Sequence, residues 1–216
     1  MAGFFISFEG IEGSGKSTQV ASLAQALRLQ GCEVVVTREP GGTAVGQVLR
    51  RLLLDSTSVP LAPGAELYLM LADRAQHVQE IVAPALRANK VVISDRFVDS
   101  TTAYQGYGRG VELALLAQLN AFACGGWMPA LTFLLDMPVS AGLQRVRRRQ
   151  SGTEDRFEAE SVAFHERIRA GYLVVAHAEP QRVCVVDAAR PVEVIHRDIL
   201  AAVRDRLPVL GKTQEA

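Results

Sequence analysis

The chain has 216 residues, of which 49% are hydrophobic and 21% charged, so we expect one globular domain over residues 1–216. Lys and Arg together number 23, as do Asp and Glu, and this balance argues against bulk binding to nucleic acid or to an anionic membrane. The three cysteines stand far apart, which argues against a zinc site or a disulfide framework and favours an intracellular, reducing compartment.

Five short β-rich segments alternate with helical patterns along the chain. They cover residues 4–8, 33–37, 91–94, 131–135 and 182–186, and most are apolar on both faces, as buried parallel strands are. This alternation predicts an α/β fold with a doubly wound parallel sheet and helices on both faces.

A glycine-rich motif follows the first expected strand. Residues 10–17 match Gly-x-x-x-x-Gly-Lys-Ser/Thr and precede a helix expected from about residue 17 to 30. The glycines let backbone N–H groups turn toward phosphate oxygens, Lys16 can bridge the β- and γ-phosphates, and the Ser17 hydroxyl can ligate Mg²⁺. The motif therefore predicts a site for ATP with Mg²⁺, and a bare strand-to-helix turn is the alternative.

Glu12 lies inside this loop, although a polyphosphate repels a carboxylate. We expect its side chain to point toward a hydrogen-bond donor, either a sugar hydroxyl of the second substrate or a water on Mg²⁺. A solvent-facing loop carboxylate is the alternative.

Two later loops also follow expected strands and carry charged side chains. Arg38 precedes a turn that contains Pro40, and Asp95 and Arg96 end another strand. Strand carboxyl ends face the ligand crevice in open α/β sheets, so Arg38 and Arg96 can grip phosphate and Asp95 can hold Mg²⁺ through water. The alternatives are a plain turn for Arg38 and a strand-capping salt bridge for the other pair. A cis peptide at Glu39–Pro40 is a further hypothesis.

Residues 65–88 have the pattern of a long helix with Pro84 near its end. Met70, Arg74 and His77 share one face of this helix by their spacing. Arg74 is either a third arm on the acceptor phosphate or a solvated surface residue.

The uncharged stretch 113–135 is long enough to suggest a membrane span. Gly125, Gly126 and Pro129 interrupt it, so we expect a buried helix, a turn and a buried strand.

An arginine-rich helix follows. Arg145 and Arg149 share one of its faces, and Arg156 comes after a polar stretch that contains glycine. A lid over about residues 145–157 that brings an arginine onto the transferring phosphoryl group is the functional interpretation. A solvated basic face or a nucleic-acid patch is the alternative.

Together these residues resemble the thymidylate kinase family, in order and over nearly the whole chain. The phosphate loop is shared by many NTPases, whereas Arg-Glu-Pro-Gly-Gly at 38–42 combined with Ala-Tyr-Gln-Gly at 103–106 is far more specific. The matching segments are residues 8–18, 37–42, 73–74, 95–97, 100–106 and 186–188 and the arginines of the expected lid.

The resemblance implies a P-loop nucleoside monophosphate kinase fold with five parallel strands in the order 2-3-1-4-5. It implies transfer of the γ-phosphate of ATP to dTMP to give dTDP for dTTP synthesis, with Mg²⁺, in a cytosolic homodimer. The arginine-rich lid matches the bacterial-type arrangement, in which the lid supplies the catalytic arginine.

The resemblance also assigns residues to roles. The catalytic group is Lys16, Arg96, Arg149 as the first choice among the lid arginines, and Arg156 as the second. The ATP group is Gly10, Ile11, Glu12, Gly13, Ser14, Gly15, Lys16, Ser17, Thr18, Arg145 and Ala188. The dTMP group is Glu12, Arg38, Pro40, Met70, Arg74, Arg96, Thr101, Tyr104 and Gln105, and the Mg²⁺ group is Ser17 and Asp95.

Within the dTMP group, Arg38, Arg74 and Arg96 would hold the phosphate. Thr101 and Gln105 would read the base edge, and Tyr104 would wall off the 2′ position. The chain departs from the family at Met70, where an aromatic residue commonly stacks on thymine. A thioether can cover the ring instead, or Phe97 or Tyr104 stacks on it.

Two other functions compete with this one. A P-loop kinase for a different nucleoside monophosphate, or for a non-nucleotide alcohol, shares every phosphate argument. A GTP-binding switch usually carries Asn-Lys-x-Asp, and the nearest match, at residues 89–92, lacks the aspartate.

Overall fold

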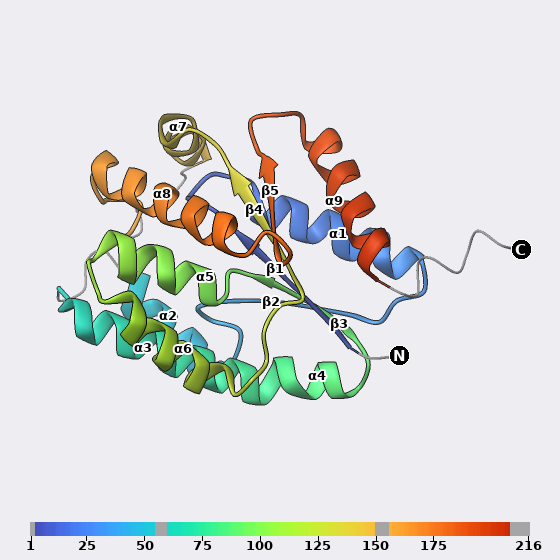
Figure 1. Ribbon diagram of the computed structural model, residues 1–216, viewed down its shortest axis with the longest axis horizontal. Helices are drawn as coiled ribbons and strands as arrows, with labels where there is room; N and C mark the ends of the chain where they lie inside the picture. Colours follow the sequence, from blue (N-terminus) through green and yellow to red (C-terminus); the bar gives the residue numbers. More distant parts are fainter. Residues whose placement is uncertain (1–2, 55–59, 150–155, 208–216) are drawn as a thin grey trace, which may run out of the picture.

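The computed structural model describes residues 3–54, 60–149 and 156–207, and a parallel sheet runs through its centre (Figure 1). The sheet has five strands in the order β2-β3-β1-β4-β5, which confirms the predicted order. The strands are β1 Phe4–Glu9, β2 Val34–Arg38, β3 Val91–Asp95, β4 Leu131–Asp136 and β5 Val183–Asp187. All five lie within a residue or so of the predicted segments.

Helices cover both faces of the sheet, with α1 and α9 together on one side and α3, α4 and α6 on the other (Figure 1). The helical segments are α1 Lys16–Leu29, α2 Ala44–Leu54, α3 Pro63–His77, η1 Val78–Val82, α4 Ala83–Arg87, α5 Val98–Thr101, η2 Thr102–Gly108, α6 Leu113–Cys124, α7 Val139–Arg149, α8 Val162–Ala178 and α9 Val192–Arg206.

Successive residues of a strand face opposite layers of helices. Ile6 belongs to the buried cluster that contains Leu23 of α1 and Ile199 of α9, whereas its neighbour Phe5 belongs to the cluster that contains Val82 of η1. Burying one large apolar side chain in this way stabilises a fold by roughly 1.5–3 kcal/mol. The two layers therefore hold the sheet rigidly beneath the loops at its carboxyl edge.

The long helix predicted at 65–88 is present as α3, η1 and α4 in direct succession. Its middle is a π-helical turn, in which the N–H of Ala83 bonds to the carbonyl of Val78, five residues earlier. Pro84 follows at once and has no N–H to give to the residue four positions before it. The wider turn accommodates the proline without ending the helix.

The stretch 113–135 folds as α6, a turn and β4, as predicted. Gly125 ends α6 in the left-handed conformation, with φ of 54°. The expectation that the helix is fully buried is wrong, because Phe122 is 89% exposed and Leu115 44% exposed. The other face of the helix packs on α3 and η2.

Among residues 3–54, 60–149 and 156–207, no helix combines the length and apolar character needed to cross a membrane. The cysteines Cys32, Cys124 and Cys184 are all free thiols.

Candidate active site

The loop between β1 and α1 has the backbone conformation of a phosphate cradle. Gly10, Gly13 and Gly15 adopt φ values of 137°, 74° and 92°, which disfavour any residue with a Cβ atom. A Cβ on Gly13 would also lie 2.2 Å from the carbonyl oxygen of Gly142 in α7. The loop leads directly into α1, whose amino-terminal N–H groups and positive dipole end suit an anion.

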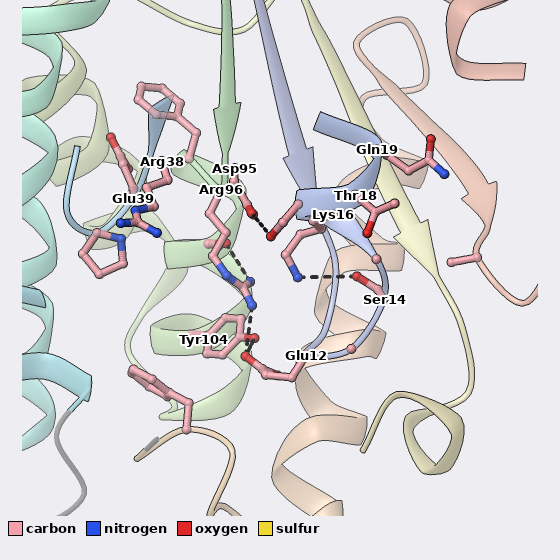
Figure 2. Close-up of a pocket in the computed structure, with 18 of the residues that line it drawn as sticks. Glu12, Ser14, Lys16, Thr18, Gln19, Arg38, Glu39, Asp95, Arg96 and Tyr104 are labelled. Atoms are coloured by element: carbon pink, nitrogen blue, oxygen red, sulfur yellow. Dashed lines mark hydrogen bonds and ion pairs between the residues drawn. The ribbon is translucent and has the colours of Figure 1, made fainter. Parts of the chain in front are cut away.

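Lys16, the first residue of α1, folds back over this loop (Figure 2). Its Nζ atom donates to the carbonyl oxygens of Gly10 and Ile11 at 3.0 and 2.9 Å and lies 3.4 Å from the Ser14 hydroxyl. Burial, and then the positive charge of Arg96, lower the pKa of Lys16 to about 8. The ammonium group therefore sits where an additional anion is electrostatically favoured.

A cavity of about 600 Å³ opens beside this loop at the carboxyl edge of the sheet. It brings together most of the residues that the sequence indicated, from the loop, from the ends of β2 and β3, and from α3, α5 and η2 (Figure 2). The predicted residues that line it are Glu12, Gly13, Ser14, Gly15, Lys16, Ser17, Thr18, Arg38, Pro40, Met70, Arg74, Asp95, Arg96, Thr101, Tyr104, Gln105, Arg145 and Ala188. Gly10 and Ile11 are buried at the base of the loop.

Two of these residues form a candidate metal-binding pair. The hydroxyl of Ser17 donates to Oδ2 of Asp95 at 2.7 Å, so the end of β3 meets the start of α1. A hydroxyl and a carboxylate are the hard oxygen ligands that Mg²⁺ prefers. The pair therefore fits a magnesium ion that accompanies a bound nucleotide.

Arg96 follows β3 and has a left-handed backbone, with φ of 71°. Such a conformation is unfavourable for a residue with a side chain, and it persists where the surroundings enforce it. The Ser94 hydroxyl donates to the carbonyl of Arg96 at 2.7 Å, and the next N–H, from Phe97, donates to Glu9 at 2.7 Å. These contacts turn the guanidinium group of Arg96 toward the cavity.

Glu12 makes the contacts that explain a carboxylate in this loop. It accepts hydrogen bonds from Arg96 at 3.0 Å and from the Tyr104 hydroxyl, and Nδ1 of His165 lies 3.3 Å from its other oxygen. Burial pushes the pKa of Glu12 upward, but His165, Arg96 and Lys16 outweigh it and hold the pKa well below its usual range. The alternative of a solvent-facing carboxylate is wrong, because the side chain is only 11% exposed.

Arg74 is buried, so the alternative of a solvated surface residue is also wrong. Its guanidinium group donates to Glu39, Thr101 and Asn120 and to the carbonyl of Phe97, at 2.6–3.0 Å. A contact with a substrate phosphate stays a prediction, and it requires one of these partners to be exchanged.

Glu39 accepts a hydrogen bond from Arg74 and was not singled out from the sequence. It is 5% exposed and lies 2.8 Å from Nδ1 of His77. Burial would raise the pKa of Glu39, but Arg74 and His77 together lower it. The peptide bond between Glu39 and Pro40 is cis, as hypothesised.

The predicted lid arginines occupy different places. Arg145 lines the cavity and donates to the carbonyl of Ala188 at 3.1 Å. Arg156 lines a separate hollow of about 200 Å³, where it pairs with Glu66 at 2.9 Å. Arg149 is the last residue of α7, and its side chain, like residues 150–155 of the predicted lid, lies outside the part that the structure describes.

Glu9 is a second supporting carboxylate that sequence reasoning missed. It is fully buried at the end of β1 and accepts hydrogen bonds from the Phe97 N–H, from the Ser100 hydroxyl at 2.6 Å and from the Tyr172 hydroxyl at 3.0 Å. Burial, and then the negative charge of Asp99, raise its pKa to about 7. A charged residue at the end of an apolar strand was the one available signal.

Comparisons with known proteins agree with one another. A sequence model described as thymidylate kinase matches residues 8–199. The thymidylate kinase of Desulfovibrio desulfuricans is 54% identical over 194 residues, which cover 88% of this chain and 89% of that protein. The thymidylate kinase of Geotalea uraniireducens is 52% identical over 209 residues, which cover 95% and 98%. A crystal structure of thymidylate kinase from Ehrlichia chaffeensis matches with a TM-score of 0.76 and 34% identity, covering 94% of this chain and 99% of that chain.

Replacing Glu9 by Gln should change how stability depends on pH. With a pKa raised from 4.5 to about 7, Glu9 binds more proton in the folded chain than in the unfolded chain across that interval. Its contribution to stability is therefore complete below pH 4.5 and is lost as the pH rises through 7. Calorimetry should show the Tm of the wild-type chain falling relative to that of Glu9→Gln across this window, whereas Glu112→Gln, at an exposed position, should follow the wild-type profile. Parallel curves for wild type and Glu9→Gln would contradict this account.

Proposed function

This chain belongs to the thymidylate kinase family, and from that premise we propose that it transfers the γ-phosphate of ATP to dTMP, giving ADP and dTDP for dTTP synthesis. The observation that carries the proposal is the single cavity that the phosphate loop and the acceptor residues line together. In such a cavity the two nucleotides can meet with their phosphates in line, and transfer is direct, with no phosphoenzyme. A kinase for another nucleoside monophosphate is the second candidate, because it would use the same phosphate contacts.

On the donor side, the N–H groups of the loop over residues 10–18 surround the phosphates of ATP, and Lys16 bridges the β- and γ-phosphates. Ser17 and Asp95, whose side-chain oxygens lie 2.7 Å apart, would hold Mg²⁺, with Asp95 acting partly through water. A magnesium ion bound there supplies charge neutralisation on the phosphate oxygens. Arg145 and Ala188, already in contact with each other, lie beside the adenine.

On the acceptor side, Arg38, Arg74 and Arg96 hold the dTMP phosphate with their planar guanidinium groups. Glu12 and Tyr104 form the wall around the deoxyribose, next to the phosphate loop. Glu12 already accepts from Arg96, so one carboxylate links the donor loop to the acceptor arm.

The base lies deeper on the acceptor side. Thr101 and Gln105 read its edge, and Met70 covers its face, with Pro40 beside it. Phe97 is the alternative stacking partner, since it also lines the cavity.

We place the lid over about residues 145–157. Its closure would exclude water and bring an arginine onto the phosphoryl group as charge develops there, which contributes roughly 10³–10⁵ in rate in related reactions. Arg149 is the first choice and Arg156 the second. Arg156 must leave Glu66 to play this part.

We also propose that two copies of the chain associate through α2, α3 and α6. These helices lie side by side (Figure 1) and expose apolar side chains, among them Phe122 at 89%, Tyr68 at 67% and Val48 at 56%. Large apolar side chains exposed on neighbouring helices are typical of a protein interface. We place the homodimer in the cytoplasm, where free thiols such as those of this chain persist.

The substrate is tested by a panel of monophosphates. With ATP and Mg²⁺ in excess and each monophosphate at a limiting concentration, ADP should be released fastest with dTMP. The reason is that the base and sugar of dTMP match the residues deep in the cavity. A higher kcat/KM with UMP, CMP or AMP would overturn the assignment of dTMP.

Replacing Lys16 by Ala should lower kcat by about 10² or more, because it removes a buried positive charge from the phosphates in the transition state. The Tm should stay close to that of the wild type. Lys90→Ala is the matched control, since Lys90 pairs with Glu33 at the surface and should leave kcat unchanged. Near-normal turnover of Lys16→Ala would remove this residue from the mechanism.

Phe122→Glu should convert the dimer to a monomer, because it introduces a charge into the proposed apolar interface. Static light scattering measures the mass directly. Leu29→Glu, at an 82% exposed position on α1, should remain dimeric. A wild-type chain with the mass of a monomer, or a dimeric Phe122→Glu variant, would refute the interface.

A further inference from the structure

Glu66 is a buried carboxylate beside the acceptor side of the cavity, and the mechanism above gives it no role. It lies in the first turn of α3 and is 1% exposed. Three side chains converge on it: Gln105 at 2.9 Å, Arg109 at 3.2 Å and Arg156 at 2.9 Å. Gln105 also lines the cavity, so Glu66 contacts a base-reading residue from behind.

The chemistry of the two groups determines how the Gln105 amide is turned. Glu66 pairs with two guanidinium groups, and an ionised carboxylate can only accept hydrogen bonds. The atom of Gln105 that faces Glu66 must therefore be the amide nitrogen, which donates to Oε1. The carbonyl oxygen of Gln105 therefore points away from Glu66.

We propose that Glu66 is a positioning residue that determines base specificity by holding the Gln105 amide with its carbonyl oxygen toward the substrate. This inference rests on the proposed function, because it takes Gln105 as a residue that reads the base edge. An amide oxygen accepts a hydrogen bond from the N3–H of thymine. Cytosine has an unprotonated acceptor at the same position, so two acceptors would face each other.

Arg109 and Arg156 stabilise the buried carboxylate of Glu66, because an unpaired buried charge is strongly destabilising. Arg109 also pairs with Glu160 at 2.6 Å, so the cluster holds two carboxylates and two guanidinium groups. Glu160 thus belongs to the same charge cluster, in which it pairs with Arg109.

The test compares dTMP with 5-methyl-dCMP, which differ only at position 4 and in the proton on N3. In Glu66→Gln, residue 66 can present either its oxygen or its NH₂ group to Gln105, so the Gln105 amide loses its fixed orientation. We expect the ratio of kcat/KM for dTMP to kcat/KM for 5-methyl-dCMP to fall at least about tenfold, the change that one mismatched buried hydrogen-bonding group produces.

Glu160→Gln is the matched control and should keep the wild-type ratio, because it alters the same cluster without touching Gln105. In a Gln105→Met background, Glu66→Gln should change the ratio no further, since Glu66 acts through the amide. If Glu66→Gln lowers activity with both substrates by the same factor and leaves the ratio intact, Glu66 has only a structural role and the inference is overturned.

Two further comparisons distinguish misfolding of the variant and failure of the proposed function from failure of the role of Glu66. If Glu66→Gln does not fold, Glu66→Asp replaces it, because it keeps the charge for the arginines and withdraws the acceptor from Gln105; an unchanged ratio then overturns the inference as well. A wild-type chain that does not prefer dTMP to 5-methyl-dCMP would overturn the proposed function itself. A wild-type chain with that preference, beside an unaffected Glu66→Gln, overturns the role of Glu66 alone.

Discussion

The parallel pairing of β1 with β3 is the constraint on which the site depends. It sets Phe8 opposite Asp95, so the loop after β1 and the loop after β3 emerge side by side at one edge of the sheet. Ser17 then reaches Asp95, and Glu12 reaches Arg96, although each pair is about eighty residues apart in the chain. One short loop thereby carries both the phosphate cradle and the carboxylate that contacts the acceptor arm.

At this edge of the sheet, charged side chains lie in and around a partly buried cavity. The chain as a whole has no net charge, yet positive side chains outnumber carboxylates in the cavity lining, which contains Lys16, Arg38, Arg50, Arg74, Arg96, Arg145 and Arg190 and, opposite in charge, Glu12, Glu39, Asp95 and Glu158. Burial, and then the positive charge of Arg96, lower the pKa of Lys16, and the phosphate groups of ATP and dTMP would offset the positive charge gathered here. Two buried carboxylates hold the arginines in position: Glu9, outside the cavity lining, accepts from the N–H that follows Arg96, and Glu39, in the lining, accepts from Arg74.

The sequence predicted the strands, their order by resemblance, and the two loops that meet in the cavity, because apolar periodicity and glycine-rich motifs are local signals. It did not predict the supporting carboxylates. Glu9 and Tyr172, for example, are 163 residues apart, and Glu66 and Arg156 are 90 apart. Such contacts depend on how helices pack on the sheet. For the same reason, spacing alone left the burial of Arg74 open and overestimated the burial of α6.

The central claim is that one cavity holds both nucleotides with their phosphates in line. A single molecule in which adenosine and thymidine are joined through their 5′ oxygens by a chain of phosphates long enough to span both sites tests it directly. Steady-state inhibition by this molecule should be competitive with ATP and also competitive with dTMP. Its inhibition constant should lie below the Kd of either nucleotide. Competition with only one of the two substrates would mean that the sites do not share a gap, and the account would be wrong.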